Sequence, residues 1–199
     1  KVAMDHTRII CVSSPGVGVN LGVTVSVAGQ TARPPTTSGN NGRSSALLSY
    51  APPAVEDIAV APDSGSSQLI DEVYTGSAAV WTSAGGTSAD APMAKIISSL
   101  PTSGGTLVDI TGVNFPPLGS PSIDMQTVLR VTYGPSGYEF NAVNCHVVQA
   151  GTVVRCQTSP GWGTDHLWVV TVAGVASPPS SLSNGVATSY ARPQLDSCS

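Results

Sequence analysis

The residues of this 199-residue chain that could do acid–base chemistry are few. Two of its three histidines follow an aspartate directly, in the pairs Asp5–His6 and Asp165–His166. Such a pair could supply a carboxylate and an imidazole for proton transfer. Adjacent residues of a β-strand point to opposite faces, so we expect neither pair to form a side-chain hydrogen bond. The histidines therefore predict no catalytic centre.

The glycine pair Gly16-x-Gly18 is the next candidate, as a nucleotide-binding loop. It lacks the third glycine and the following helix that a dinucleotide site requires. The pair recurs as Gly161-x-Gly163 before another β-prone segment, which indicates a turn. The chain also has no G-x-S-x-G, H-E-x-x-H or EF-hand motif. We therefore expect no enzyme activity and no cofactor.

Two further groups of residues could bind a ligand. The acidic residues lack the spacing of a calcium loop and are interpreted as a solvated segment; they are Asp63, Asp71, Glu72 and Asp90. The tryptophans could form a platform for a sugar ring; they are Trp81, Trp162 and Trp168. Trp162 is the best candidate because it lies in a predicted turn.

The cysteines favour a disulfide over a metal. No C-x-x-C spacing occurs among Cys11, Cys145, Cys156 and Cys198, so a zinc site is not predicted. The spacing of Cys145 and Cys156 suits a disulfide between neighbouring strands. Four cysteines with almost no lysine fit an extracellular or cell-surface protein. No N-x-[ST] sequence is present, so any glycan must be O-linked.

Composition and charge narrow the fold and the partners. With 21 glycines, 16 prolines and few strong helix formers, the chain is not a long-helix protein. Eight basic against 12 acidic residues argue against nucleic-acid binding through a basic surface. No apolar stretch reaches the length of a membrane span. Short alternating runs of valine and isoleucine predict an all-β protein.

An internal repeat organises the chain. Residues 11–18 (Cys-Val-Ser-Ser-Pro-Gly-Val-Gly) recur at residues 156–163 (Cys-Gln-Thr-Ser-Pro-Gly-Trp-Gly), an offset of 145. The same offset relates residues 25–29 to residues 170–174. Each copy then passes through a Pro/Ser-rich loop into a short strand that ends in a tyrosine, Tyr50 or Tyr190, at an offset of 140. We infer two copies of one supersecondary unit.

The second copy contains about seven short β-prone segments between residues 94 and 193, the size of an immunoglobulin-like sandwich. Its motifs resemble the IPT/TIG family, the immunoglobulin-like domains of plexins, cell-surface receptors, Rel-type transcription factors and tandem-array extracellular proteins. The residues that carry the resemblance are Pro101, Gly104, Gly105, Val108, Ile110, Gly112, Asn114, Phe115, Cys156, Pro160, Gly161, Gly163, Val170, Val172, Gly174 and Tyr190. The first copy matches only from Cys11 onward. The resemblance implies tandem immunoglobulin-like β-sandwiches, the first one incomplete.

Four regions follow from the repeat and the resemblance. We predict the carboxyl-terminal half of a first domain at residues 1–53 and an interdomain segment with extra strands at 54–93. A complete second domain is expected at 94–193, followed by a tail at 194–199.

Three sources remain open for the missing half of the first domain. It could be absent from this stretch of chain, or it could come from the β-prone segments of the interdomain region, residues 55–60, 68–74 and 78–82. A neighbouring protomer could also supply it by strand addition.

The other two cysteines bear on this question. Cys11 lies in the first strand of the first copy and Cys198 beyond the last strand of the second. In an elongated array these ends are too far apart for a bridge within one chain. A disulfide between Cys198 of one chain and Cys11 of the next would close a head-to-tail contact. The alternative is two free thiols.

Two Pro/Ser/Thr-rich loops occupy equivalent positions in the copies and have the composition of O-glycosylated segments. The candidate positions are Pro34, Pro35, Thr36, Thr37, Ser38, Pro178, Pro179, Ser180 and Ser181, where the prolines would carry sugar after hydroxylation. The alternative is a pair of plain hairpin loops. Since only 10% of residues are charged, the surface is poorly protected against association, and sugar or neighbouring subunits would cover it.

The function that fits these observations is structural. We expect an extracellular protein that assembles head to tail with itself into a filament or surface coat and carries covalent glycans. We expect no nucleic-acid partner and no membrane span in this stretch. The alternative is a piece of a receptor or adhesin ectodomain that binds a protein or a glycan.

Overall fold

The structure is a computed structural model that describes residues 2–4, 8–32, 47–61, 97–118 and 128–195. Apart from one short 3-10 helix and the helical residue Val128, the regular structure in these residues is β-strand, so the predicted all-β class is confirmed. The elements are β1 (Val2–Met4), β2 (Arg8–Ile9), β3 (Leu21–Gly22), β4 (Ser26–Val27), β5 (Gln30–Thr31), β6 (Leu47–Leu48), β7 (Ala54–Val60), β8 (Ile97–Leu100), β9 (Leu107–Val113), β10 (Leu129–Gly134), β11 (Phe140–Asn141), β12 (Val143–Gln149), β13 (Val153–Gln157), β14 (Leu167–Val172), β15 (Val175–Ala176), η1 (Leu182–Asn184) and β16 (Thr188–Tyr190).

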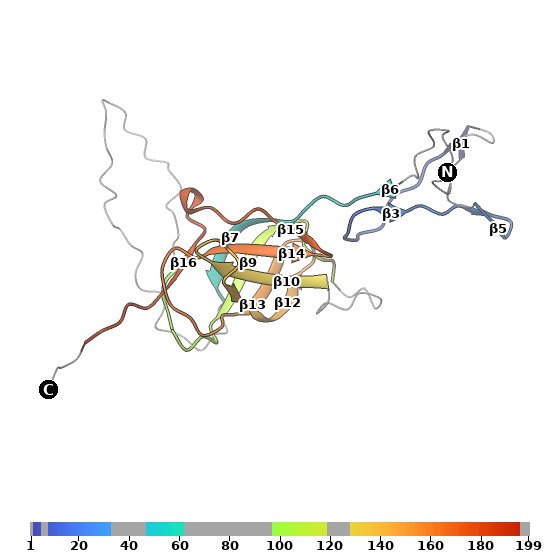
Figure 1. Cartoon of the computed structure of the whole chain (residues 1–199). Coiled ribbons are helices and arrows are strands. Elements are labelled where there is room, and N and C mark those ends of the chain that lie inside the picture. Colours follow the sequence, from blue (N-terminus) through green and yellow to red (C-terminus); the bar gives the residue numbers. More distant parts are fainter. Residues whose placement is uncertain (1, 5–7, 33–46, 62–96, 119–127, 196–199) are drawn as a thin grey trace, which may run out of the picture.

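Two four-stranded antiparallel sheets form the second copy (Figure 1). One has the order β12–β13–β9–β7 and the other β11–β10–β14–β15. Strand β8 pairs in parallel with β16 at the side of the sandwich. With β7, β9, β13 and β12 as strands A, B, E and D, and β10, β14 and β15 as C, F and G, this is the strand order of an immunoglobulin sandwich. The predicted sandwich is confirmed.

Strand β7 corrects the predicted role of residues 54–60. The sequence places them between the domains and offers them as a donor for the first copy, but β7 pairs with β9 along its length. Ile58 lies opposite Ile110 and is buried in the core of the second sandwich. Pro52 and Pro53 lie between the first copy and this strand. Because proline has no backbone N–H to donate to a neighbouring strand, the two residues separate β7 from the first copy. The other two candidate donor segments, 68–74 and 78–82, lie outside the described residues.

The core of the second sandwich surrounds Trp168. Its side chain is fully buried and stacks on Tyr133 with ring centroids 4.3 Å apart. Its Nε1–H donates to the hydroxyl of Thr188 at 3.0 Å. The inward residues of β9, β13 and β14 complete the core because side chains alternate between the two faces of a strand; they include Val108, Ile110, Val154, Cys156, Val170 and Val172.

The first copy repeats the second half of this sandwich strand by strand. The β1–β2 hairpin has the register of the β12–β13 hairpin, and β4–β5 has that of β14–β15. Val27 pairs with Gln30 where Val172 pairs with Val175, so the offset of 145 residues holds in the structure (172 − 27 = 145). The two hairpins of the first copy therefore have the same registers as their counterparts at the sequence offset of 145 residues.

The turn that leads from β2 toward β3 is repeated down to single atoms. The hydroxyl of Tyr50 donates to the carbonyl of Ser14 at 2.6 Å, and that of Tyr190 to the carbonyl of Ser159 at 2.6 Å. Each tyrosine side chain approaches to within 2.7 Å of the position that a Cβ atom would take on the glycine after the turn proline. Only glycine fits there, so both glycine pairs are structural, as predicted.

Candidate functional site

The first copy exposes the face that is buried in the second copy. We call this surface the open face; it consists of Ile9, Cys11, Leu21, Val23, Val25 and Val27, all exposed. Their equivalents, at the offset of 145, are the buried residues Val154, Cys156, His166, Trp168, Val170 and Val172. Val23 is 47% exposed, whereas Trp168 in the same position is 0% exposed. Apolar side chains that lie in solvent where their equivalents are buried indicate a surface that another molecule covers.

The open face exists because two central strands of the sandwich have no counterpart in the described part of the first copy. In the second copy β9 pairs with β13 and β10 pairs with β14. In the first copy β2 pairs with β1 and β4 with β5, and no other described strand joins these two sheets. A strand edge without a neighbour presents backbone N–H and C=O groups that can pair with an added strand. The open face thus combines apolar side chains with strand edges.

The first copy meets the second at a junction next to the linker. The side-chain amide of Asn114 donates to the carbonyl of Pro52 at 2.8 Å. Val17, in the repeated turn, is half-buried and packs against the core of the second sandwich. A pocket at this contact is lined by Val17, Gly18, Tyr50, Ala51, Pro53, Asn114, Val172 and Val175. The turn of one unit therefore lies against the β14–β15 hairpin of the next.

A buried aromatic cluster lies beneath the equivalent turn of the second copy. The hydroxyls of Tyr133 and Tyr190 are 2.6 Å apart, and both contact Ser159. Burial raises the pKa of Tyr190 far above its ordinary value. His166 lies edge-on to both tyrosine rings, and neither of its ring nitrogens has a hydrogen-bond partner. The hydroxyls bond to one another and to the backbone, which fits a structural role.

Lowering the pH from 7.5 to 5.0 is expected to destabilise the second sandwich through His166. Burial lowers the pKa of this imidazole below its ordinary 6.5. The backbone of Trp162 and Gly163 and, to a smaller extent, the carboxylates of Glu139 and Asp165 raise the pKa but do not reverse the shift. The unfolded chain therefore binds the proton before the folded chain does. Stability present above pH 6.5 is lost as the pH falls, by up to about 1.4 kcal/mol per pH unit, which urea unfolding at several pH values measures.

Two variants isolate this effect. His166→Phe removes the titrating group and is expected to flatten the pH profile, whereas His146→Gln, at an exposed histidine, should leave the profile unchanged. The hydrogen bond from Ser136 lowers the pKa of Glu139 from 4.5 to about 2, so the stability that this carboxylate contributes is lost mainly below pH 4.5 and changes little above pH 5. A flat profile in the unsubstituted chain would contradict the prediction.

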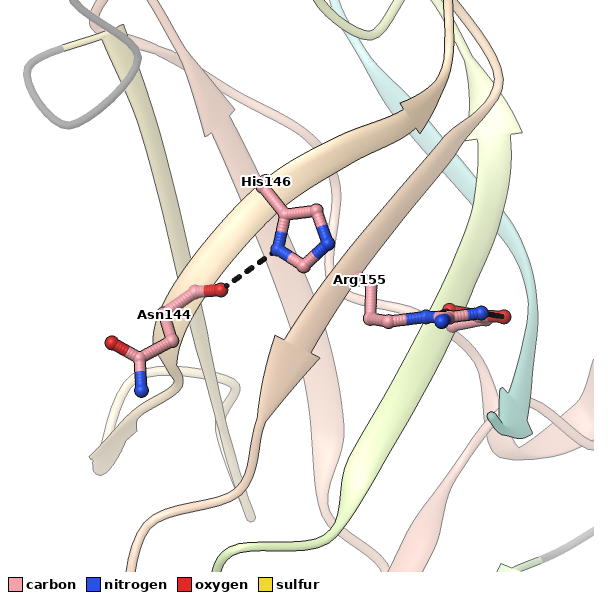
Figure 2. A network of polar contacts seen from close by, with 4 residues as sticks. Asn144, His146 and Arg155 are labelled. Carbon is pink, nitrogen blue, oxygen red and sulfur yellow. Dashed lines mark hydrogen bonds and ion pairs between the residues drawn. The ribbon is translucent and has the colours of Figure 1, made fainter. Parts of the chain in front are cut away.

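A row of polar side chains crosses the outer face of the β12–β13–β9–β7 sheet (Figure 2). His146, Arg155 and Asp109 are successive cross-strand partners on β12, β13 and β9. Arg155 Nε and Nη2 donate to the two carboxylate oxygens of Asp109 at 2.6 and 2.8 Å, and His146 Nδ1 lies 3.1 Å from the carbonyl of Asn144. The bidentate ion pair neutralises the guanidinium, so it links β13 to β9 rather than forming a charged binding site.

The comparisons with known proteins agree with this fold. Residues 93–190 match the family model of the IPT/TIG domain. The chain carries an IPT/TIG domain. Comparison with curated proteins and with solved structures gives no match. IPT/TIG domains occur in adhesin and receptor ectodomains and in transcription factors, and they are typically non-enzymatic.

The cysteines divide between the IPT/TIG domain and the first copy. Cys145 and Cys156 form the predicted disulfide, which joins β12 to β13 with the Cα atoms 4.1 Å apart. Cys11, the equivalent of Cys156, has an exposed free thiol. Cys198 lies outside the described residues, so the intermolecular bridge between Cys11 and Cys198 stays a prediction.

The glycosylation candidates differ in exposure. Those at residues 34–38 lie outside the described part of the chain, and Pro178 and Pro179 are exposed. The prediction of a glycan on Ser180 is wrong, because the hydroxyl of this residue is buried. The hydroxyl accepts a hydrogen bond from the backbone N–H of Trp168 in β14 at 2.9 Å and donates one to the carbonyl of Val186 at 2.6 Å. A glycan cannot reach that oxygen in the folded domain. Pro178, Pro179 and the half-buried Ser181 stay predictions.

The remaining ligand candidates are few. Asp5, His6, the four acidic residues of the 62–96 segment and Trp81 lie outside the described residues. Trp162 is 76% exposed, as expected for a turn residue, whereas Trp168 belongs to the core. In the part of the chain that the structure describes, no three His, Cys, Asp or Glu side chains gather in a metal-binding arrangement, and no helix has the length and hydropathy to cross a membrane.

Proposed function

We propose that this protein is a non-enzymatic extracellular structural protein whose copies assemble head to tail into a filament or surface coat. In this assembly, strands from a neighbouring copy cover the open face of the first copy. The observation that carries the proposal is the open face itself, where six residues whose equivalents lie in the core of the IPT/TIG domain remain in solvent.

Covering the open face would supply a driving force for association. Fully burying an aliphatic side chain contributes about 1.5–3 kcal/mol, so each of the five half-exposed aliphatic residues there would contribute on the order of 1 kcal/mol. An added strand would also satisfy the backbone groups of the exposed strand edges. The burial of the aliphatic side chains and the pairing of the strand edges both occur on the open face. Together they favour a polypeptide strand over a small ligand as the partner.

The arrangement of the two ends suits a head-to-tail contact. The first copy projects from one end of the sandwich, and residues 191–195 leave it at the opposite end (Figure 1). A contact between two unlike ends produces an open filament when its rotation does not close a ring. A bridge between Cys11 of one copy and Cys198 of another would make this contact covalent.

The surface and the disulfide support the extracellular setting. Disulfides persist in oxidising compartments, and the Cys145–Cys156 bridge fits such a compartment. The low fraction of charged residues leaves the surface prone to association, which suits dense packing or a cover of sugar. We propose O-linked glycans on Pro178 and Pro179, both exposed, after hydroxylation of their rings supplies the oxygen for the glycosidic bond, and in the equivalent loop at residues 34–38.

Sedimentation velocity of the full chain over a range of concentrations, with electron micrographs of the same samples, tests the assembly. We expect elongated multimers that Val25→Asp abolishes, because a carboxylate on the open face cannot be buried without a partner. Val148→Asp is the matched control: Val148 is 43% exposed against 40% for Val25, but it lies on the IPT/TIG domain. This control should assemble normally.

A second measurement does not depend on the folding of the first copy. Non-reducing electrophoresis should show disulfide-linked multimers of the unsubstituted chain that disappear in Cys11→Ser. A monodisperse monomer in both experiments would overturn the proposal. It would favour the alternative, a piece of a receptor or adhesin ectodomain in which the exposed Trp162 serves a ligand.

A further inference from the structure

The turn that forms the junction between the first copy and the IPT/TIG domain has an equivalent that is not covered. At the offset of 145, Val17 corresponds to Trp162 (162 − 17 = 145). Val17 is half-buried against the sandwich that follows it, whereas Trp162 is 76% exposed. The indole thus occupies the position that carries an interdomain contact in the other copy.

The hairpin on which Val17 packs also has an uncovered equivalent. Val17 shares the junction pocket with Val172 and Val175 of the β14–β15 hairpin. The corresponding residues of the β4–β5 hairpin are Val27 and Gln30, with the same cross-strand pairing. Val27 is 64% exposed, whereas Val172 is buried. One copy of the chain therefore contains one complete junction and both separate halves of a second.

These two halves lie where a neighbouring copy could join them. The backbone N–H of Tyr190 donates to the carbonyl of Gly163 at 2.9 Å, which places the Trp162 turn beside the end of β16. Residues 191–195 leave the sandwich from there, and the β4–β5 hairpin lies at the opposite end of the molecule (Figure 1). The halves are thus too far apart to meet within one chain.

We propose that Trp162 of one copy docks on the β4–β5 hairpin of the next copy, over Val27 and Gln30, as Val17 docks on the β14–β15 hairpin within the chain. This docking rests on the proposed head-to-tail assembly and names its contact surface. The partner is a second copy of this protein, since the internal junction supplies the template for both sides of the contact.

The chemistry of the two sides is complementary. On docking, a tryptophan at position 162 would bury more apolar area than the valine at position 17 does. Tryptophan is also enriched among the residues that dominate interface energies. Where the internal junction has the methyl groups of Val175, the hairpin offers the amide of Gln30, whose oxygen can accept a hydrogen bond from the indole N–H. The ring of Trp162 already rests edge-on against Phe140, so little freedom is lost on docking.

A charge exchange in the full chain tests the contact. Trp162→Glu is expected to weaken assembly at least about tenfold in sedimentation velocity, the range typical of an interface residue of this kind. Gln30→Lys combined with Trp162→Glu should restore part of the assembly, because the two new charges attract across the contact. Tyr138→Glu, at another exposed aromatic on the neighbouring turn, is the matched control and should show neither loss nor rescue.

The outcomes separate this docking from the proposed function. If the unsubstituted chain is a monomer, both proposals are overturned. If it assembles and Val25→Asp blocks assembly while Trp162→Glu assembles normally, only the docking of Trp162 is overturned. Loss in Trp162→Glu without rescue by Gln30→Lys would place the partner of Trp162 elsewhere and overturn the assignment of the β4–β5 hairpin.

Discussion

Trp168→Ala is expected to lower the free energy of unfolding of the IPT/TIG domain by about 3–5 kcal/mol. The indole is fully buried between the sheets, so its removal leaves a cavity that the surrounding strands cannot close. It also removes the stacked contact with Tyr133 and leaves the hydroxyl of Thr188 without its donor. Urea unfolding followed by circular dichroism measures the loss.

The equivalent residue of the first copy provides the matched control. Val23 occupies the position of Trp168 but is 47% exposed, so Val23→Ala in dilute solution should change the free energy of unfolding by no more than about 0.5 kcal/mol. A loss of more than about 1.5 kcal/mol in that variant would mean that Val23 is buried in the isolated chain. The open face would then not exist in solution, and the comparison between the two positions decides this directly.

The internal repeat could be predicted from the sequence because its residues are fixed by local sterics. The Pro-Gly turn recurs with a tyrosine at a near-constant distance, and the ring of that tyrosine occupies the space where any side chain on the glycine would lie. Glycine and tyrosine at these positions depend on each other, so their spacing survives wherever the turn forms. The alternating valines of β14 likewise predict a buried strand without knowledge of its partners.

Long-range pairing could not be predicted in the same way. Residues 54–60 form a strand, as their composition indicates, but nothing in the local sequence says that the partner is β9 rather than the first copy. The pairing is decided by the burial of Ile58 in a complete core, which is a property of the assembled sandwich. The prediction of a glycan on Ser180 was wrong for a related reason. A Pro-Pro-Ser-Ser stretch has the composition of a loop whether or not one of its hydroxyls points inward.

The junction was missed although the sequence held a signal for it. The offset of 145 aligns Val17 with Trp162, two apolar residues in turns, where polar residues are usual. An apolar residue at the tip of a turn indicates a contact with something outside its own unit. Sequence alone identifies that position, but only the structure shows that Val17 lies against the β14–β15 hairpin.

Removing the Cys145–Cys156 disulfide with a Cys145→Ala, Cys156→Ala double substitution is expected to cost the IPT/TIG domain about 3 kcal/mol. The bridge closes a short loop with a sequence separation of 11, and the entropy that it removes from the unfolded chain corresponds to about that value. Because β12 is the edge strand of its sheet, held by β13 alone, the loss should be concentrated there. Thermal unfolding measures the global loss, and amide hydrogen exchange in β12 measures the local one.

Cys11→Ala is the control for this prediction and links it to the open face. Cys11 is the equivalent of Cys156, but its thiol is exposed and free, so the substitution should leave the unfolding of the isolated chain unchanged. In the assembled protein the same substitution should lower stability if Cys11 is bridged to the neighbouring copy. Equal effects of Cys11→Ala on the dilute chain and on the assembled chain would contradict a covalent head-to-tail contact, because the same thiol would then have the same environment in both states.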